Sequence, residues 1–310
     1  MKSLHSNKPW LALAAGLAVV ATLPWLVSEF ATSVLLSCLM YIALATSWSL
    51  FCGATRYLSL ATSAFFGIGA YTSATLLTVL PWPLVIVSGA LIASIVAVVM
   101  GAAVLHLRGT YFAVLTFGMT ELIRHAVTFV EKQVSGTVGR VLTVVPSNET
   151  VYLTVLLIAA AAIATAIAIQ RSRFGLALSG IGADEQRAQT LGVDTRLAKI
   201  AGFGITAAFA GAVGAAMAVR WTYIEPAAVF SPFIGFQTVL IALIGGATSI
   251  GGPILAAIVF SLLAETLRLQ LPYGYMMVLG LLLILCVMYL PNGLATLWQR
   301  RKPAAEAHHG

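Results

Sequence analysis

The sequence predicts an all-α, polytopic transmembrane helical bundle of about ten spans, some of them short or re-entrant. Of its 310 residues, 60% are hydrophobic and only 9% are charged, and the mean hydropathy is +0.98. Soluble domains carry about 25% charged residues, so a chain this apolar belongs in a bilayer. Two further observations support the bundle: apolar runs of membrane-spanning length, and basic residues that gather on one side of them.

The apolar runs set the number of spans, because about 20 apolar residues cross a bilayer as a helix. Clear runs lie at residues 10–27, 32–51, 58–79, 83–107, 152–169, 200–221 and 275–290. Three others are less regular: 111–130 contains charged residues, 233–246 is short, and 253–271 carries Glu265 and Arg268. The run at 10–27 is long and lacks a clean cleavage site, so it is interpreted as a retained first span.

The basic residues test this count. With ten spans, both termini and most of the 17 Lys and Arg residues lie on one side, and the other side holds Lys132, Arg140, Arg220 and Arg268. Basic loops face the cytoplasm, so the sequence predicts an even number of crossings with both termini cytoplasmic. The basic residues lie at span ends without interleaved aromatics, a pattern that fits anionic lipid and not nucleic acid.

The longest polar segment, residues 172–199, separates two apolar halves and carries several basic residues, so it is placed in the cytoplasm. Within it, residues 183–191 are predicted to form a short helix with Asp184 and Glu185 in its first turn. Gly192 follows directly, and we expect it to supply a left-handed helix end. A short cytoplasmic helix of this kind offers a docking surface, with Asp184, Glu185 and Arg187 expected to face a soluble partner.

Two other features leave alternatives open. Gly245-Gly246 and Gly251-Gly252-Pro253 flank a polar Thr-Ser pair, which indicates either a broken helix on a transport path or a tight cytoplasmic turn. Glu121, Arg124 and His125 share one helical face by their spacing. They form either a polar lining of a path or an internally paired cluster at the membrane edge.

The sequence lacks the motifs of the common catalytic and nucleotide sites. It contains no GxxxxGK[ST] loop, no HExxH, no GxSxG and no paired Cys/His spacing, so no enzyme activity, cofactor or metal site is predicted. Its three cysteines, Cys38, Cys52 and Cys286, are interpreted as buried free thiols.

Several motifs together resemble branched-chain amino acid ABC transporter permeases of the LivM type. LRGTYFAVLTFGMTELIR, from Leu107, resembles the family's LRG-YFA-LTL segment, and LSLATSAFFGIGAYTSA, from Leu58, resembles its LSLGHAAFFGIGAY segment. Further matches fall in the polar segment, at the Gly-Gly pairs and at the C-terminal Pro291-Asn292-Gly293-Leu294. The chain departs from the family pattern at Ser179 and Gly182, where basic residues are common, and at residues 135–139.

The resemblance implies an ATP-driven importer subunit in a bacterial inner membrane. Its implied partners are a homologous permease chain, two cytoplasmic ATP-binding subunits, an extracytoplasmic substrate-binding protein and membrane lipid. The implied cargo is branched-chain amino acids or related small amino acids and amides. A stand-alone secondary transporter or channel is the alternative function, and an intramembrane enzyme is a third class that lacks a catalytic set.

The expected organisation is one permease domain at residues 1–302, with a coupling loop at 170–199 and a short cytoplasmic tail at 303–310, too short for a fused ATPase. The residues expected to couple to the ATPase are Arg173, Gly175, Asp184, Glu185, Arg187 and Gly192. The residues expected to line the substrate path are Thr62, Tyr71, Tyr111, Thr116, Gly245 and Gly246.

Overall fold

The computed structural model describes residues 20–107, 109–142, 145–221 and 223–271, with 274, 277, 278, 280 and 281. In this part of the chain, seven helices are long and apolar enough to cross a membrane. They span Glu29–Gly53, Trp82–Val104, Thr110–Val134, Asn148–Gln170, Thr195–Arg220, Pro226–Gly245 and Gly251–Gln270. The all-α, polytopic bundle predicted from the sequence is confirmed, and the chain is a multi-pass membrane protein.

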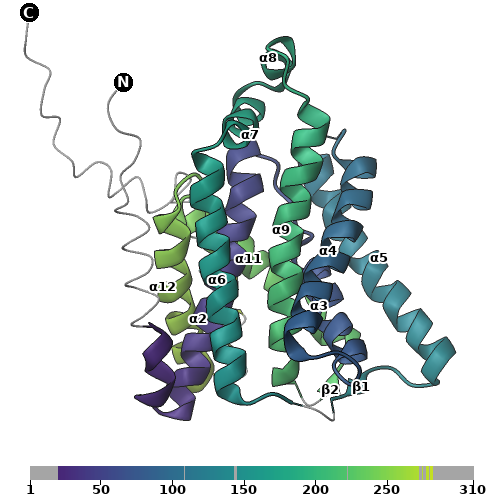
Figure 1. The fold of residues 1–310 in the computed structure, drawn as a ribbon, viewed down its shortest axis with the longest axis vertical. Helices are drawn as coiled ribbons and strands as arrows, with labels where there is room; N and C mark the ends of the chain where they lie inside the picture. The colour runs from purple at the N-terminus through teal and green to yellow at the C-terminus, as the bar shows by residue number, and fades with distance from the viewer. Residues whose placement is uncertain are drawn as a thin grey trace, which may run out of the picture.

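The centre of the bundle is formed by α2 (Glu29–Trp48) and α9 (Thr195–Met217), the two most buried long helices. Figure 1 shows α6 (Asn148–Gln170) beside α9, with α12 (Gly251–Gln270) and α11 (Pro232–Gly245) near α2. Helix α2 continues into a π-helical turn, η2 (Ser49–Gly53), which widens its last turn. The short helix α10 (Pro226–Val229) precedes α11, and η1 (Leu23–Trp25) precedes α2.

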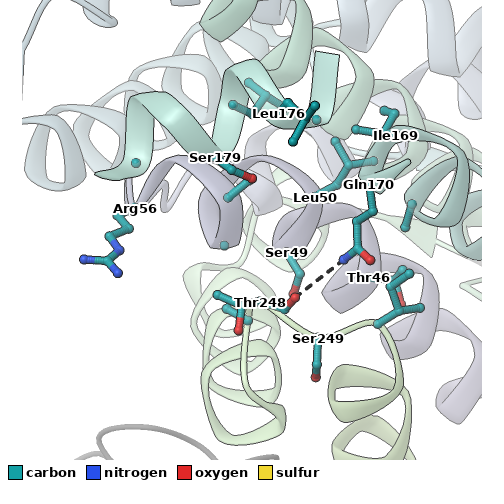
Figure 2. Close-up of a pocket in the computed structure, with 18 of the residues that line it drawn as sticks. Thr46, Ser49, Leu50, Arg56, Ile169, Gln170, Leu176, Ser179, Thr248 and Ser249 are labelled. Carbon is teal, nitrogen blue, oxygen red and sulfur yellow. Dashed lines mark hydrogen bonds between the residues drawn. The ribbon is translucent and has the colours of Figure 1, made fainter. Parts of the chain in front are cut away.

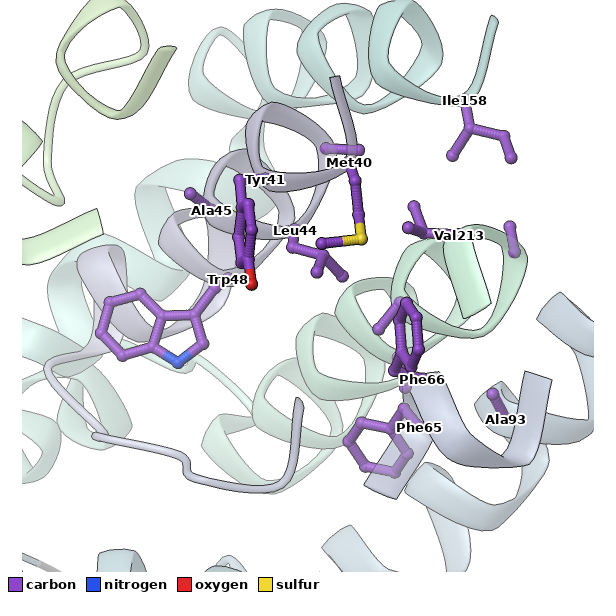
Figure 3. Packing of buried hydrophobic residues seen from close by; sticks show 14 of the residues in the cluster. Met40, Tyr41, Leu44, Ala45, Trp48, Phe65, Phe66, Ala93, Ile158 and Val213 are labelled. Atoms are coloured by element: carbon purple, nitrogen blue, oxygen red, sulfur yellow. The ribbon is translucent and has the colours of Figure 1, made fainter. Parts of the chain in front are cut away.

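Small residues bring three helices into direct backbone contact. Helix α3 (Thr62–Leu76) and helix α4 (Trp82–Val104) both pack on α9. A Cβ atom built on Gly69 of α3 would lie 1.9 Å from the carbonyl oxygen of Gly211 on α9, so no side chain fits there. Figure 3 shows Phe65, Phe66 and Val213 gathered near this crossing. Close approach at small residues, here as in other membrane helices, explains the glycines of these segments.

The count of ten spans is not confirmed. Seven of the predicted spans match the seven helices above, and the runs at 10–27 and 275–290 lie mostly outside the described residues. The run at 58–79 forms only the 15-residue α3, because the chain before Thr62 is not helical. There Arg56 adopts φ +60°, and the carbonyl of Ser59 accepts a 2.9 Å hydrogen bond from the Trp48 indole.

Helix α5 (Thr110–Ser135) stands away from the other helices at its C-terminal end (Figure 1). About half of its residues are exposed, including Tyr111, Leu122 and Phe129. The helix ends at Gly136, whose φ of +69° reverses the chain and whose N–H bonds to the Lys132 carbonyl. A short antiparallel ladder, β1 (Arg140–Val141) with β2 (Tyr223–Ile224), then joins the loop after α5 to the end of α9 through η3 (Ala218–Arg220).

The polar segment folds into two helices, α7 (Arg173–Ala183) and α8 (Glu185–Thr190). The prediction of one helix at 183–191 was therefore wrong in its bounds: Asp184 is the cap before α8, and α7 was missed. Figure 1 places α7 and α8 together at one end of the bundle, with β1 and β2 at the other. Because α12 starts near α7, Arg268 in its last turn shares the β1–β2 end with Arg140 and Arg220.

Candidate functional site: the coupling segment and the solute path

Helix α8 is closed at both ends by hydrogen bonds. The Asp184 carboxylate accepts the N–H groups of Gln186 and Arg187 at 3.0 and 3.1 Å, which makes it the N-cap. At the other end Gly192 has φ +86°, its N–H bonds to the Gln189 carbonyl, and the next N–H bonds to the Ala188 carbonyl. These two bonds form a Schellman motif, so the prediction of a left-handed helix end at Gly192 is confirmed.

The inner face of α8 carries a buried ion pair. The Glu185 carboxylate accepts a 2.7 Å hydrogen bond from the Lys199 ammonium on α9 and a 2.8 Å hydrogen bond from the Tyr57 hydroxyl. Lys199 also donates to the Leu105 carbonyl at 2.8 Å and lies 4.8 Å from the centre of the Tyr57 ring. Glu185 and Lys199 are 9% and 5% exposed, so both charges lie away from solvent.

This ion pair, which we call the Glu185–Lys199 cluster together with Tyr57 and the Leu105 carbonyl, ties four segments together. It connects α8 to α9, to the end of α4 and to the chain after α2. Burial raises the pKa of the Tyr57 hydroxyl, and its hydrogen bond to Glu185 raises it further. The phenol therefore stays protonated and acts as a donor to the carboxylate.

The expectation that Glu185 faces a soluble partner was wrong, because its carboxylate points into the protein. The outward face of α8 instead presents Arg187, which pairs with Asp184 at 3.1 Å, and the exposed side chain of Leu191. Arg173 is exposed at the start of α7. A Cβ atom on Gly175 would lie 2.1 Å from the Ile169 carbonyl, so Gly175 lets α7 fold back on the end of α6.

A cavity of about 420 Å³ lies beneath α7. Its walls come from α7, the ends of α2 and α6, and the turn at 246–250 between α11 and α12. Figure 2 shows Ser49, Gln170 and Ser179 around this space, with the Gln170 amide donating to the Thr248 carbonyl at 3.5 Å. Gly182 also lines it and packs so closely on Ala54 that a basic side chain would not fit there.

The glycine pairs form a tight turn. Helix α11 ends at Gly245 and α12 begins at Gly251, and the Gly246 N–H bonds to the Leu243 carbonyl at 3.0 Å. A Cβ atom on Gly252 would lie 1.8 Å from the Gly245 carbonyl oxygen, so the two helices touch through backbone. Of the two alternatives left by the sequence, the tight turn is the one observed, at the same end of the bundle as α7.

The predicted path residues fall into separate environments. Thr116 on α5 is buried and its hydroxyl accepts the Leu60 N–H at 3.1 Å, next to Thr62 at the start of α3. Tyr111, five residues before Thr116 on the same helix, is 78% exposed. Tyr71 is buried at the other end of α3, so the structure does not bring these four residues into one lining.

Tyr71 is hydrogen-bonded to a buried carboxylate that the sequence did not single out. Its hydroxyl donates to buried Glu131 on α5 at 3.0 Å, and the same carboxylate accepts the Gly139 N–H at 2.8 Å and the Arg140 guanidinium at 3.2 Å. This arrangement ties α5 to α3 and to the β1–β2 ladder. The only sequence signal was a lone acidic residue near the end of a predicted span.

The polar cluster within α5 is internally paired. The Arg124 guanidinium lies 2.5 Å from the Glu121 carboxylate, and His125 lies 3.9 Å from it. This observation favours the paired cluster over the polar path lining. Cys38 and Cys52 are buried free thiols, as expected, whereas Cys286 lies outside the described residues. Among the residues whose positions are described, no group of three His, Cys, Asp or Glu side chains could hold a metal ion.

Comparison with known families provides independent evidence about the family of this chain. The family described as "Branched-chain amino acid transport system / permease component" matches residues 30–288, a stretch that contains every long helix described above except the first residue of α2. The chain belongs to this family. Membership confirms the resemblance found in the motifs, and the family is one of transport permeases and not of enzymes.

Two curated relatives are similar along nearly the whole chain. The "High-affinity branched-chain amino acid transport system permease protein LivM" of Escherichia coli strain K12 is 27% identical over 322 residues, covering 93% of this chain and 75% of that protein. The protein of the same name from Salmonella typhimurium strain LT2 is 26% identical with the same coverage. No solved structure matches this chain significantly.

Proposed function

We propose that this permease is one membrane subunit of an ATP-driven importer for branched-chain amino acids or related small amino acids and amides. The observation that carries the proposal is the family match over residues 30–288. Relatives named for high-affinity branched-chain amino acid transport support the cargo. The subunit works in a bacterial inner membrane with both termini in the cytoplasm, where the basic α7–α8 end would also lie.

In this proposal, α8 is the element that receives force from a cytoplasmic ATP-binding subunit. Its outward face, with Arg187 and Leu191, docks the partner, and Arg173 extends the docking surface along α7. The buried Glu185–Lys199 cluster then passes motion of α8 to α9 and α4, since a hydrogen-bonded ion pair resists separation of its charges. Glu185 therefore acts from within the subunit, and Gly175 and Gly192 set the turns on either side.

A second permease chain is proposed to pack along α5. The exposed apolar side chains of this helix, Tyr111 among them, would be covered by a homologous partner or by lipid tails. The solute path would then lie between the two chains, with Tyr111 on its wall and the buried Thr62, Thr116 and Tyr71 holding α3 and α5 in place. An extracytoplasmic binding protein would deliver solute at the β1–β2 end, and the turn at Gly245-Gly246 lies at the exit end.

Reconstitution in vesicles tests this proposal. The purified permease, its partner permease and a leucine-loaded binding protein are combined with and without ATP-binding subunits, and leucine accumulation is measured. Uptake that requires both ATP and the ATP-binding subunits is the expected result. Leucine accumulation by the permease alone along a proton or sodium gradient would instead identify a secondary transporter.

Arg187→Glu tests the docking face of α8. Reversing this exposed charge should weaken copurification of the ATP-binding subunit and lower uptake. Lys132→Glu, at the end of α5 and at the opposite end of the bundle, serves as the charge-matched control. Equal copurification of the ATP-binding subunit with both variants would remove α8 from the proposed contact.

A further inference from the structure

The cavity beneath α7 contains two buried hydroxyl groups that have no partner. Thr46 is 2% exposed and Ser49 is 9% exposed, and both line the cavity. Among the residues that the structure describes, neither hydroxyl oxygen has a hydrogen-bond donor or acceptor within reach. Burying a hydroxyl without a hydrogen bond costs free energy, so these groups are suited to a ligand that supplies the missing partner.

The backbone around these hydroxyls is irregular. Thr46 lies in the last turn of α2, and Ser49 begins the π-helical turn η2, where the normal hydrogen-bond ladder is interrupted. Single π-helical turns inside α-helices occur frequently at functional sites. Ser49 lines the cavity at this turn, and among the described residues its hydroxyl oxygen has no hydrogen-bond partner.

The lining determines what kind of molecule fits. Its polar groups are hydroxyls, the Gln170 amide and backbone carbonyls, and its apolar groups are aliphatic, such as Leu50 and Ile169. Among the described residues that line the cavity, Arg56 alone is charged, and Figure 2 shows its side chain extending away from the other labelled residues. A nucleotide, a phosphate or a metal ion would find no charge of opposite sign directed into the cavity. A small molecule of zero net charge does not need one.

The helix ends that meet at the cavity favour a zwitterionic ligand. Helices α2 with η2 and α6 end at the cavity, so the negative ends of their dipoles lie there, while α7 and α12 begin at it, so the positive ends of their dipoles lie there. Carbonyls at helix ends favour an ammonium group, and N–H groups at helix starts favour a carboxylate. An aliphatic amino acid combines both groups with an apolar body, and about 420 Å³ accommodates it.

The geometry points to a second solute site, open to the cytoplasmic end, in which an aliphatic amino acid binds between α7 and the bundle and slows transport. The identity of the ligand rests on the proposed function. One wall of the cavity belongs to the coupling segment and the other to α2 and the 246–250 turn. A ligand that bridges the two walls favours the arrangement in which it fits, and so opposes the movement of α7 that ATP binding would drive. Accumulated product would then inhibit its own import.

The test uses the whole transporter in vesicles preloaded with leucine, with glycine as a matched ligand that lacks the apolar body. Initial ATP-dependent uptake is measured as a function of internal leucine for the wild type and for Thr46→Val/Ser49→Ala. We expect internal leucine to slow the wild type and the half-inhibiting concentration to rise at least tenfold in the variant. Ser73→Ala is the control, since it removes an equally buried and unpartnered hydroxyl that does not line this cavity.

Thermal unfolding of the purified transporter provides a readout that does not depend on uptake. Leucine should raise the unfolding temperature of the wild type and of Ser73→Ala, glycine should raise it less, and Thr46→Val/Ser49→Ala should respond to leucine less than the wild type does. An equal response to leucine in the double variant, or no response in the wild type, would mean that water alone fills the cavity or that leucine binds elsewhere. Absence of any uptake by empty vesicles would overturn the proposed importer and leave this unfolding result to decide the cavity.

Discussion

The burial of the Glu185–Lys199 cluster predicts that removing one charge destabilises the protein much more than removing both. Glu185→Met leaves the Lys199 ammonium, 5% exposed, without its carboxylate, and Lys199→Met leaves the Glu185 carboxylate without its ammonium. Removing one partner of a buried ion pair costs about 3–5 kcal/mol, because the remaining charge is poorly solvated. Replacing both partners by apolar residues of similar volume is often neutral or stabilising.

The double variant Glu185→Met/Lys199→Met should therefore be more stable than either single variant. Its loss of unfolding free energy should fall short of the sum of the single losses by at least about 2 kcal/mol. The measurement is denaturant unfolding of the detergent-solubilised protein, followed by tryptophan fluorescence or circular dichroism. Arg187→Met is the control, because it breaks the exposed 3.1 Å pair with Asp184, and exposed pairs contribute at most about 1 kcal/mol.

Additive losses in the double variant would refute the reasoning, since they would mean that Glu185 and Lys199 stabilise the fold independently. Single losses no larger than that of Arg187→Met would refute it as well. In that case the carboxylate would be solvated, and α8 would be held to α9 by packing alone.

Three further results are expected. Gly192→Val should lower the unfolding free energy by about 1–2 kcal/mol, whereas Gly192→Asn should be tolerated, because φ is +86° there and no atom would crowd the added Cβ; equal stability of the two variants would contradict this. Gly69→Ala should destabilise the protein by at least about 1–3 kcal/mol through overpacking, while Gly118→Ala, with nothing within 4 Å of its Cβ, should not, and unfolding of both variants measures the contrast. Because the pKa of Tyr57 is raised in the folded protein, its contribution to the free energy of unfolding is fully present below about pH 10, the usual pKa of tyrosine, and is lost as pH rises through the folded-state pKa. Tyr57→Phe should therefore reduce the loss of stability at alkaline pH. An unchanged profile of stability against pH in this variant would count against the reasoning.

Hydropathy identified the long spans, because each of the seven described spanning helices contains a stretch of membrane-spanning length with high mean hydropathy, even where α5 and α12 carry charged residues. It overestimated α3, since residues 58–61 are apolar or small but are not helical. Their polar backbone is instead satisfied locally, for example by the Trp48 indole and the Thr116 hydroxyl. Periodicity and hydropathy do not report such long-range bonds.

The polar segment shows a second limit. Gly192 was predicted correctly because a glycine after a short helix has a local structural reason. Helix α7 was missed because Gly175, Gly180 and Gly182 lower its intrinsic helix propensity, and close packing on α6 and Ala54 outweighs that loss.

The orientation of Glu185 was not accessible from local sequence at all. Its partners lie 14 and 128 residues away, at Lys199 and Tyr57. An acidic residue in the first turn of a surface helix is usually solvated, and only the tertiary fold places it inside.

The contact between Gly69 and Gly211 is a point about which α9 can tilt relative to α3. Backbone touches backbone there, so the two helices cannot approach further, but one can tilt on the other. Lys199 lies about 18 Å before this point along α9, and Met217 about 9 Å beyond it, at 1.5 Å per residue. If α9 moves as a rigid lever, a push delivered by α8 at Lys199 reappears at the β1–β2 end in the opposite direction and at about half the amplitude. Distances between paired spin labels at the two ends of α9 and a fixed position on α6 would register opposite changes on ATP binding, whereas changes of the same sign would exclude the lever.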